Sequence, residues 1–117
     1  VVNEYLQSKE VIDYLIRLND LLEGTPFKVA YRVRDEFLIY CYYSGLFDEK
    51  PDNWLEITLD EMTAMKVLSR IEGDEPKTGK VLTDLDRVLN EKFPITTAKL
   101  NEMRKRLQVN GYTSFWS

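Results

Sequence analysis

The sequence predicts an all-α fold, a compact bundle of about five helices in one domain. Two observations predict it. Apolar residues recur three and four positions apart in successive segments, the spacing that places them on one side of a helix. Glycine or proline stands near the ends of these segments, where a helix has to stop. A chain of 117 residues, 44% hydrophobic and 31% charged, suits one globular domain with a single core.

The first helix is expected over residues 9–23. Ser8 is a suitable N-cap, and Gly24 stands where a helix commonly ends in a left-handed residue. A Thr-Pro pair then interrupts the chain, and a short extended segment is expected over 27–30. The apolar stripe of the helix is broad enough for contact on two sides. It consists of Val11, Ile12, Leu15, Ile16, Leu18, Leu21 and Leu22.

The second helix is expected over residues 31–44, with Gly45 as its stop. Phenylalanine and tyrosine are frequent over 37–43, so a strand is the competing prediction there. The helix is preferred because the charged segment 32–36 does not alternate between polar and apolar residues. The stripe of this helix consists of Val33, Phe37, Tyr40, Cys41 and Ser44.

Two further helices are expected after a polar loop over 46–54. The third helix is expected over 58–71, and the fourth over 80–92, with Pro94 ending it. The glycine-bounded segment 73–79 between them is expected to be a mobile charged loop. The stripes of the two helices are Leu59, Met62, Met65, Leu68 and Ile71, and then Val81, Leu82, Leu85, Val88 and Leu89.

The fifth helix is expected to start after Thr96 and to run to about residue 109, with Gly111 closing it. Ile95 and Leu100 are expected to form a hydrophobic staple around its first turn. The tail over 112–117 carries three aromatic residues, so we expect it to dock on the core or on a partner.

The composition excludes several kinds of chemistry. Without histidine and with the single cysteine Cys41, the chain has no Ser-His-Asp or Cys-His centre, no Cys/His zinc site and no internal disulfide. Cys41 is therefore interpreted as a buried packing residue, and a reducing, cytoplasmic compartment is expected. No apolar run reaches the roughly 20 residues of a membrane span. The net charge of -4 argues against a surface wholly devoted to nucleic acid.

Neither the acidic pairs nor the glycine-rich segment predicts a catalytic or metal site. Adjacent acids on a helix point about 100° apart, and spaced pairs without other oxygen ligands make poor metal cages. The segment 73–79 lacks the Gly-x-x-x-x-Gly-Lys-Ser/Thr order of a P-loop. The adjacent pairs, interpreted as solvated surface, are Asp35-Glu36 and Asp60-Glu61, and the spaced pairs are Glu10 with Asp13 and Asp84 with Asp86.

Two arginines at the start of the second helix are the main candidate site. Arg32 and Arg34 lie where the helix dipole favours an acid over a base, so they could bind an anion from outside the chain. The competing interpretation pairs them with a nearby acid such as Asp35 or Glu36. The physics of the residues alone favours this surface pairing.

A second basic cluster lies on the fifth helix and could contact nucleic-acid phosphates. Its members are Lys99, Arg104, Lys105 and Arg106. Residues 104–106 span nearly a full turn, however, and the apolar stripe of this helix, Leu100, Met103 and Leu107, must face inward. A solvated helix whose bases complement its dipole is therefore the favoured interpretation.

Four segments of the chain share a pattern with a known family. They read Leu-Ile-Arg-Leu-Asn-Asp-Leu-Leu over 15–22, Phe-Lys-Val-Ala-Tyr-Arg-Val over 27–33, Leu-Asp-Glu-Met through Lys-Val-Leu-Ser-Arg-Ile-Glu-Gly over 59–73, and Lys-Leu-Asn-Glu-Met-Arg-Lys-Arg-Leu running into Gly-Tyr-Thr-Ser-Phe-Trp over 99–116. In this order they resemble the C-terminal region of McrB-like AAA+ NTPases, found in methylation-dependent restriction systems. The resemblance covers most of the chain.

The resemblance implies a helical lid that follows a nucleotide-binding core, so residues 1–117 are expected to be one domain of a larger AAA+ protein. It implies that Arg32 is the sensor 2 arginine, with Arg34 in reserve, and that Tyr31 and Arg32 contact the nucleotide. That nucleotide is GTP or ATP with Mg²⁺, bound mainly by residues outside this chain. The sequence has no Walker A, Walker B, sensor 1 or arginine finger, so it is not expected to hydrolyse NTP alone.

The implied partners are the AAA+ core domain, neighbouring subunits, a nuclease subunit, and DNA in the full assembly, with no membrane. Two alternatives remain open at this point. One is a stand-alone helical protein-protein interaction module that binds through its aromatic tail. The other is a helical DNA-binding domain that uses the fifth helix.

Overall fold

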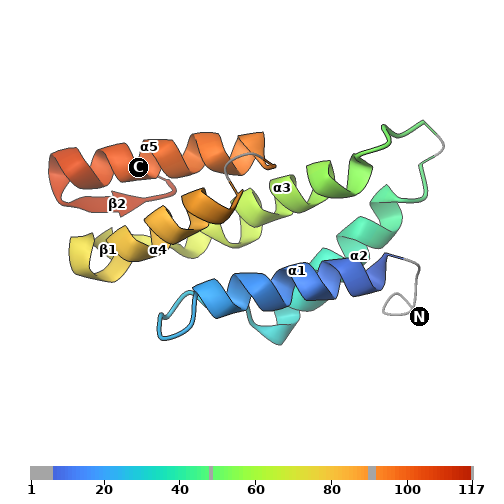
Figure 1. Ribbon diagram of the computed structural model, residues 1–117, viewed down its shortest axis with the longest axis horizontal. Helices are drawn as coiled ribbons and strands as arrows, with labels where there is room; N and C mark the ends of the chain where they lie inside the picture. The colour runs from blue at the N-terminus through green and yellow to red at the C-terminus, as the bar shows by residue number, and fades with distance from the viewer. Residues whose placement is uncertain (1–6, 48, 90–91, 117) are drawn as a thin grey trace.

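The computed structural model describes residues 7–47, 49–89 and 92–116, and in these ranges the chain is mostly helical (Figure 1). The prediction of an all-α bundle of five helices is confirmed. The helices are α1 (Ser8–Leu21), α2 (Tyr31–Ser44), α3 (Trp54–Lys66), α4 (Glu75–Leu89) and α5 (Pro94–Asn110), with a short 3₁₀ turn η2 (Leu68–Arg70). A small sheet accompanies them, formed by β1 (Glu72–Asp74) and β2 (Tyr112–Ser114).

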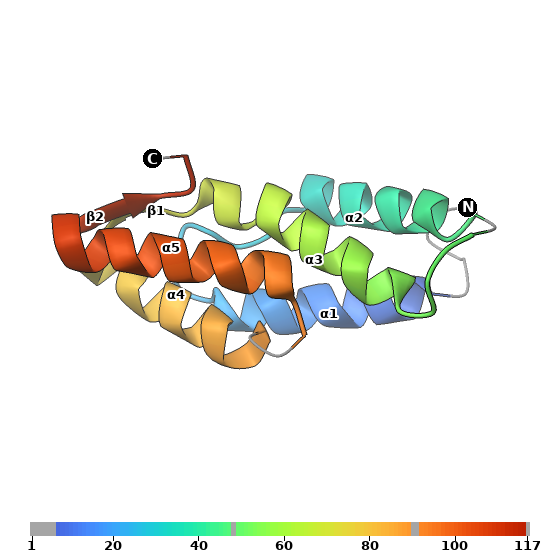
Figure 2. The ribbon, with the colours of Figure 1, turned by 90° about the horizontal axis from the view of Figure 1, so that it is seen from above.

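The helices form two pairs joined by α3. α4 packs on α5 at one end of the molecule, α1 packs on α2 at the other, and α3 contacts both α2 and α5. Figure 2 shows this order along the long axis, with the sheet at the end opposite α2. The result is an elongated body of 45 × 27 × 22 Å.

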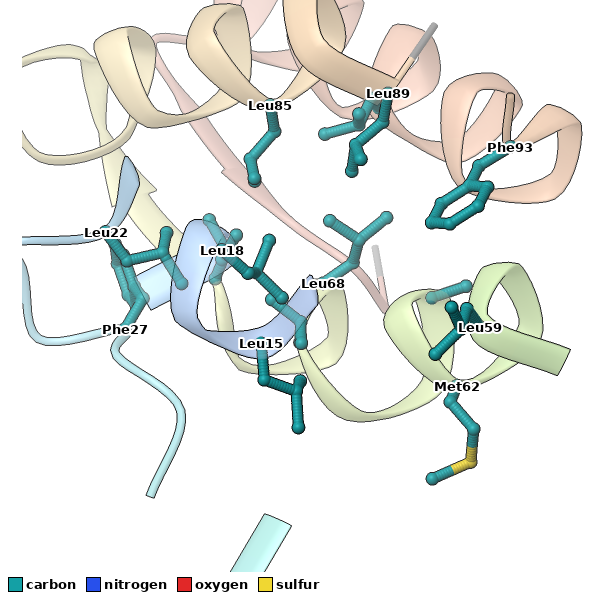
Figure 3. Close-up of a cluster of buried hydrophobic side chains, with 14 of the residues drawn as sticks. Leu15, Leu18, Leu22, Phe27, Leu59, Met62, Leu68, Leu85, Leu89 and Phe93 are labelled. Atoms are coloured by element: carbon teal, nitrogen blue, oxygen red, sulfur yellow. The ribbon is translucent and has the colours of Figure 1, made fainter. Parts of the chain in front are cut away.

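The core lies between all five helices and includes buried side chains of each. Leucines of α1 and α4 point into the same space as Leu59, Leu68 and Phe93 (Figure 3). Fully burying a side chain of this size contributes about 1.5–3 kcal/mol relative to leaving it exposed. The largest fully buried side chains include Phe37, Leu18, Leu22, Leu38, Met62, Leu68, Ile71, Leu82, Leu85, Leu100 and Met103.

The sheet joins two segments that lie far apart in the sequence. β1 runs antiparallel to β2, with Gly73 opposite Thr113. Because β1 leads directly into α4 and β2 follows α5, the pairing ties these two helices together at one end. The tail therefore docks on the domain over β2, as expected, although Trp116 remains 78% exposed. Ser117 lies outside the described residues.

The expectation of a mobile loop over 73–79 is wrong. Residues 72–74 form β1, and α4 begins at Glu75. Pro76 fits because the first turn of a helix needs no backbone donor there. Gly79 lies inside α4, where the end of the exposed Glu75 side chain covers the place that a Cβ would occupy. The strand could not be predicted from its own residues, because its partner β2 lies in the tail, far away in the sequence.

The boundaries of the first two helices are close to those expected. α2 covers residues 31–44 as predicted, and the competing strand is wrong. α1 starts at Ser8 itself, so Gln7 is the N-cap and Ser8 is not. The helix ends at Leu21, although Gly24 does adopt the left-handed conformation with φ 79°. No described strand pairs with 27–30, so that segment is a connection, not part of a sheet.

The later boundaries differ more. α3 begins at residue 54, inside the segment expected as a loop, and its last turn gives way to η2. Met65 is 49% exposed and Val88 is 45% exposed, so neither belongs to the core stripe. The expected end of the fourth helix falls partly on residues 90–91, which lie outside the described ranges.

Pro94 is the first residue of α5, whereas it was expected to end the preceding helix. A proline suits the first helical position because its missing N–H has no partner there in any case. Thr96 then lies within the first turn, and Ile95 is 50% exposed, so the expected hydrophobic staple is wrong. Gly111 closes the helix as predicted, with φ 73° and its N–H bonded to the Leu107 carbonyl.

Candidate functional site

The N-terminus of α2 is held in place by α1. The Asn19 side chain accepts a hydrogen bond from the Val29 N–H at 2.6 Å and donates one to the Val29 carbonyl at 3.2 Å. The chain therefore enters α2 at a defined position beside α1. Ala30 is the N-cap and supplies no side-chain cap, and the first turn of α2 contains no acid. The partial positive charge of this helix end is thus not offset by its own first turn.

Arg32 projects from this helix end into solvent. No hydrogen bond, ion pair or ring contact joins its side chain to a residue in the described part of the chain. The nearby acids have other partners, since Asp35 lies 3.6 Å from Arg34 and Glu36 lies 2.8 Å from Lys66. A guanidinium without a local acid is able to bind an anion from outside the chain.

Arg34 occupies a different environment. It forms the 3.6 Å ion pair with Asp35, and its guanidinium lies over the Tyr31 ring at 5.0 Å from the centroid. Its Nε atom is buried, with no hydrogen-bond acceptor among the described residues. Surface pairing, the interpretation favoured by residue physics, thus describes Arg34 and does not describe Arg32. Tyr31 itself is 78% exposed.

A groove of about 470 Å³ runs between α1 and α2 beside these residues. Arg34 and Lys28 are the charged residues of its lining, and Arg32 stands outside it. No sequence pattern indicates this groove, because the aliphatic residues that α1 contributes belong to the stripe that predicts a helix contact. The remaining lining residues are Ile12, Leu15, Ile16, Asn19, Val29, Ala30 and Tyr31.

A second groove of about 510 Å³ lies between α1, α3 and the end of α4. Its floor includes Tyr14 and Phe93, whose rings meet edge to face at 5.5 Å. Its charged residues are of both signs, the acids Glu10, Asp13 and Glu56 and the bases Arg17 and Lys92. Within the described residues no group of His, Cys, Asp or Glu is placed to hold a metal ion.

Most of the basic cluster on α5 is engaged inside the domain. Lys99 pairs with Glu102 at 3.4 Å and lies over the Phe115 ring at 4.5 Å. Arg106 pairs with Glu102 and donates a hydrogen bond to the Ser114 carbonyl at 2.8 Å. These contacts secure the tail on α5, a role that the sequence did not indicate.

Two members of the basic cluster remain. Arg104 pairs with Asp86 at 3.0 Å, so it joins α5 to α4. Lys105 is exposed. The cluster therefore offers little free positive charge for nucleic acid, and its contacts agree with the structural interpretation.

Asp60 corrects one sequence-based interpretation. It was expected on the solvated surface with Glu61, yet it is 2% exposed. Its carboxylate accepts hydrogen bonds from the N–H groups of Ile95 and Thr96 at 2.9 and 2.7 Å. The side chain thereby caps the start of α5 from within α3, using a carboxylate at the positive end of a helix. The other adjacent pair, Asp35 and Glu36, does lie toward the surface.

Cys41 is the packing residue that the composition suggested. It is fully buried, and this burial raises the pKa of its thiol to about 12. A thiol that stays protonated at neutral pH is a poor nucleophile. The domain therefore gains packing from Cys41 and no reactive centre.

Comparison with known proteins identifies the family and nothing more detailed. A family described as a domain of unknown function, DUF8727, matches residues 2–112. The chain belongs to the DUF8727 family. No curated protein and no solved structure matches the chain.

The DUF8727 match includes every described helix and the groove between α1 and α2. Arg32 lies well inside it, as does the Asp60 cap of α5. None of the described helices of this DUF8727 domain is long and apolar enough to cross a membrane.

Proposed function

We propose that this DUF8727 domain is the lid of a McrB-like AAA+ NTPase that acts in DNA restriction and defence against phage. In this role Arg32 is the sensor 2 arginine, which contacts the phosphates of a nucleotide held by the core domain. The lid then couples the state of the nucleotide to the conformation of the oligomer. One observation carries the proposal: Arg32 is exposed at an uncapped helix N-terminus, with no acid paired to it among the described residues.

The chemistry of this helix end suits a triphosphate. A guanidinium is planar, permanently charged and able to donate two parallel hydrogen bonds to phosphate oxygens. The helix dipole of α2 adds a favourable field for an anion at the same place. Tyr31, one residue earlier and largely exposed, is available to contact the same nucleotide. Arg34 remains the reserve candidate, because its ion pair and its stacking on Tyr31 occupy it locally.

Hydrolysis in this proposal belongs to the complete protein. GTP or ATP with Mg²⁺ is bound mainly by the core domain, and Arg32 stabilises charge that develops on the transferred phosphoryl group. The glycine-bounded segment 73–79 lacks the P-loop order, and β1 passes directly into α4 without a loop between them, which supports leaving phosphate binding to residues elsewhere. The partners are the core domain, neighbouring subunits, a nuclease subunit and, in the assembly, DNA.

The test uses the full-length protein that carries this domain. Arg32→Ala is expected to lower NTP hydrolysis on the order of 100-fold, the usual effect of removing one donor to a transition-state anion. The melting temperature of the domain should change by less than about 2 °C, because the side chain is exposed. Lys105→Ala, which removes another exposed cation, is the matched control and should leave both quantities unchanged. Normal hydrolysis by Arg32→Ala, or a parent gene without a P-loop upstream, would end the proposal.

A second candidate function, a stand-alone interaction module, is favoured by one observation. Large apolar side chains are exposed together at the end of α2 and in the loop that follows. They are Ile39, Tyr40, Tyr43, Leu46 and Phe47, with exposures between 40% and 69%. An adaptor would use this surface, and Phe47→Glu would then abolish partner binding while Arg32→Ala would have no effect. The reverse pattern supports the lid.

A further inference from the structure

The groove between α1 and α2 is walled by aliphatic residues and is open to solvent. Ile16 illustrates the wall, because it lines the groove and is still 55% exposed. An aliphatic surface left open in this way is favourable to cover, at about 25 cal/mol for each Å² removed from water. The volume of about 470 Å³ is within the usual range for a bound small molecule or a few side chains of a peptide.

The charge of the groove has one sign. Lys28 and Arg34 are its charged lining residues, and no acid contributes to the lining. Lys28 has a 2.8 Å contact with Glu23, but both side chains are exposed, so this pair contributes little and is easily exchanged. Arg34 forms a 3.6 Å ion pair with Asp35, but this pair also lies at the surface, and the buried Arg34 Nε has no hydrogen-bond acceptor among the described residues. The groove therefore complements a ligand that carries negative charge beside an apolar group.

The polar side chains of the groove argue against a nucleotide base. The amide of Asn19 already bonds both backbone groups of Val29, so it has little capacity left to read the edge of a base. The Tyr31 ring already lies against the Arg34 guanidinium. Aliphatic walls with cations at the rim suit an aliphatic side chain followed by a carboxylate.

We infer that the groove between α1 and α2 docks a segment of a partner protein in which aspartate or glutamate alternates with leucine-like side chains. The aliphatic side chains lie on Ile12, Ile16 and Val29, and the carboxylates pair with Lys28 and Arg34. The groove shares Tyr31 and Arg34 with the surface of the proposed lid function, but Arg32, which carries that proposal, does not line it.

A short fluorescent peptide that alternates leucine and aspartate is the probe. Its binding to the whole chain is measured by fluorescence anisotropy, and amide chemical shifts map the site. Shifts are expected over 12–19 and 28–34. The double variant Lys28→Glu/Arg34→Glu should weaken binding at least roughly tenfold, as should Ile16→Glu, because each introduces an uncompensated like charge or removes the apolar contact.

Matched substitutions outside the groove distinguish docking in the groove from nonspecific binding of the peptide to the surface. Lys105→Glu alters an exposed cation on α5, and Val109→Glu alters a 78% exposed aliphatic residue near the end of the same helix, so both should bind the probe normally. Peptides that alternate leucine with lysine, or serine with aspartate, should not bind. Equal binding of these peptides, shifts located elsewhere, or displacement of the probe by Mg-ATP or Mg-GTP would overturn the inference. Because Arg32→Ala leaves probe binding intact, loss of the lid proposal and loss of this one are distinguishable.

Discussion

Asp60 and Thr96 bond each other twice across the interface of α3 and α5. The Thr96 N–H donates to the Asp60 carboxylate at 2.7 Å, and the Thr96 hydroxyl donates to the Asp60 carbonyl at 3.0 Å. Both side chains are almost completely buried. A reciprocal pair of this kind fixes the start of α5 against the middle of α3, and so sets the angle between the two halves of the bundle.

This relationship predicts that Asp60→Ala is among the most destabilising single changes in the domain. The buried Thr96 N–H and the partly buried Ile95 N–H would lose their acceptor, at a cost of about 2–3 kcal/mol in the free energy of unfolding. Urea unfolding followed by circular dichroism measures the loss. Asp20→Ala, which removes an exposed acid from α1, should change the same quantity by less than about 0.5 kcal/mol. Equal effects of the two substitutions would show that the Asp60 cap makes no particular contribution to the free energy of unfolding.

Apolar periodicity was sufficient to predict the class of fold and the exact extent of α2. A helix of this kind is defined by residues three and four positions apart, so its signal is local and survives without knowledge of the partner. Cys41 was also predictable, because the absence of histidine left packing as its natural role. Arg32 was noticed for its position at a helix start, although its lack of a partner could be learned only from the structure.

Two features that escaped prediction, the Asp60 cap and the strand β1, depend on residues distant in the sequence. Asp60 looks like half of an ordinary acidic pair until α5 approaches it from 35 residues away. Residues 72–74 have the composition of a loop, and they form a strand only because Tyr112–Ser114 lies alongside. Pro94 illustrates a different limit, because a proline can follow one helix and begin the next, and the sequence does not say which.

Stability should fall at alkaline pH in a way that depends on Cys41. Burial holds the thiol protonated in the folded state, with a pKa of about 12, whereas an unfolded thiol ionises near pH 8.5. The unfolded state therefore binds fewer protons above that pH, so stability is complete below it and falls as pH rises toward the folded value. Between pH 8 and pH 10 this one group should remove about 2 kcal/mol from the free energy of unfolding.

Cys41→Ala provides the comparison for that pH dependence. The variant loses packing at every pH, since the side chain is fully buried, but it lacks the thiol that titrates. Its free energy of unfolding should therefore decline less steeply than that of the wild type when both are measured by urea unfolding with a reductant present. Every other ionisable group is common to both proteins, so its contribution cancels in the difference. Parallel pH profiles would mean that the thiol is accessible to ionisation in the folded state.

The tail should depend on Arg106 for its position. This arginine donates to the Ser114 carbonyl and pairs with Glu102, so it links the end of β2 to α5. Arg106→Ala is expected to cost about 1–2 kcal/mol in the free energy of unfolding, because it removes charge-assisted hydrogen bonds from a partly buried site. Amide hydrogen exchange should accelerate at Thr113, which pairs with Gly73 in the small sheet.

Lys105→Ala is the neighbouring control, since Lys105 is exposed on the same helix. Under the structural interpretation it changes neither stability nor exchange. If α5 instead bound DNA phosphates, both substitutions would weaken DNA binding and reduce its salt dependence. Stability and DNA binding measured for both variants therefore show whether these cations hold the tail in place or bind nucleic acid.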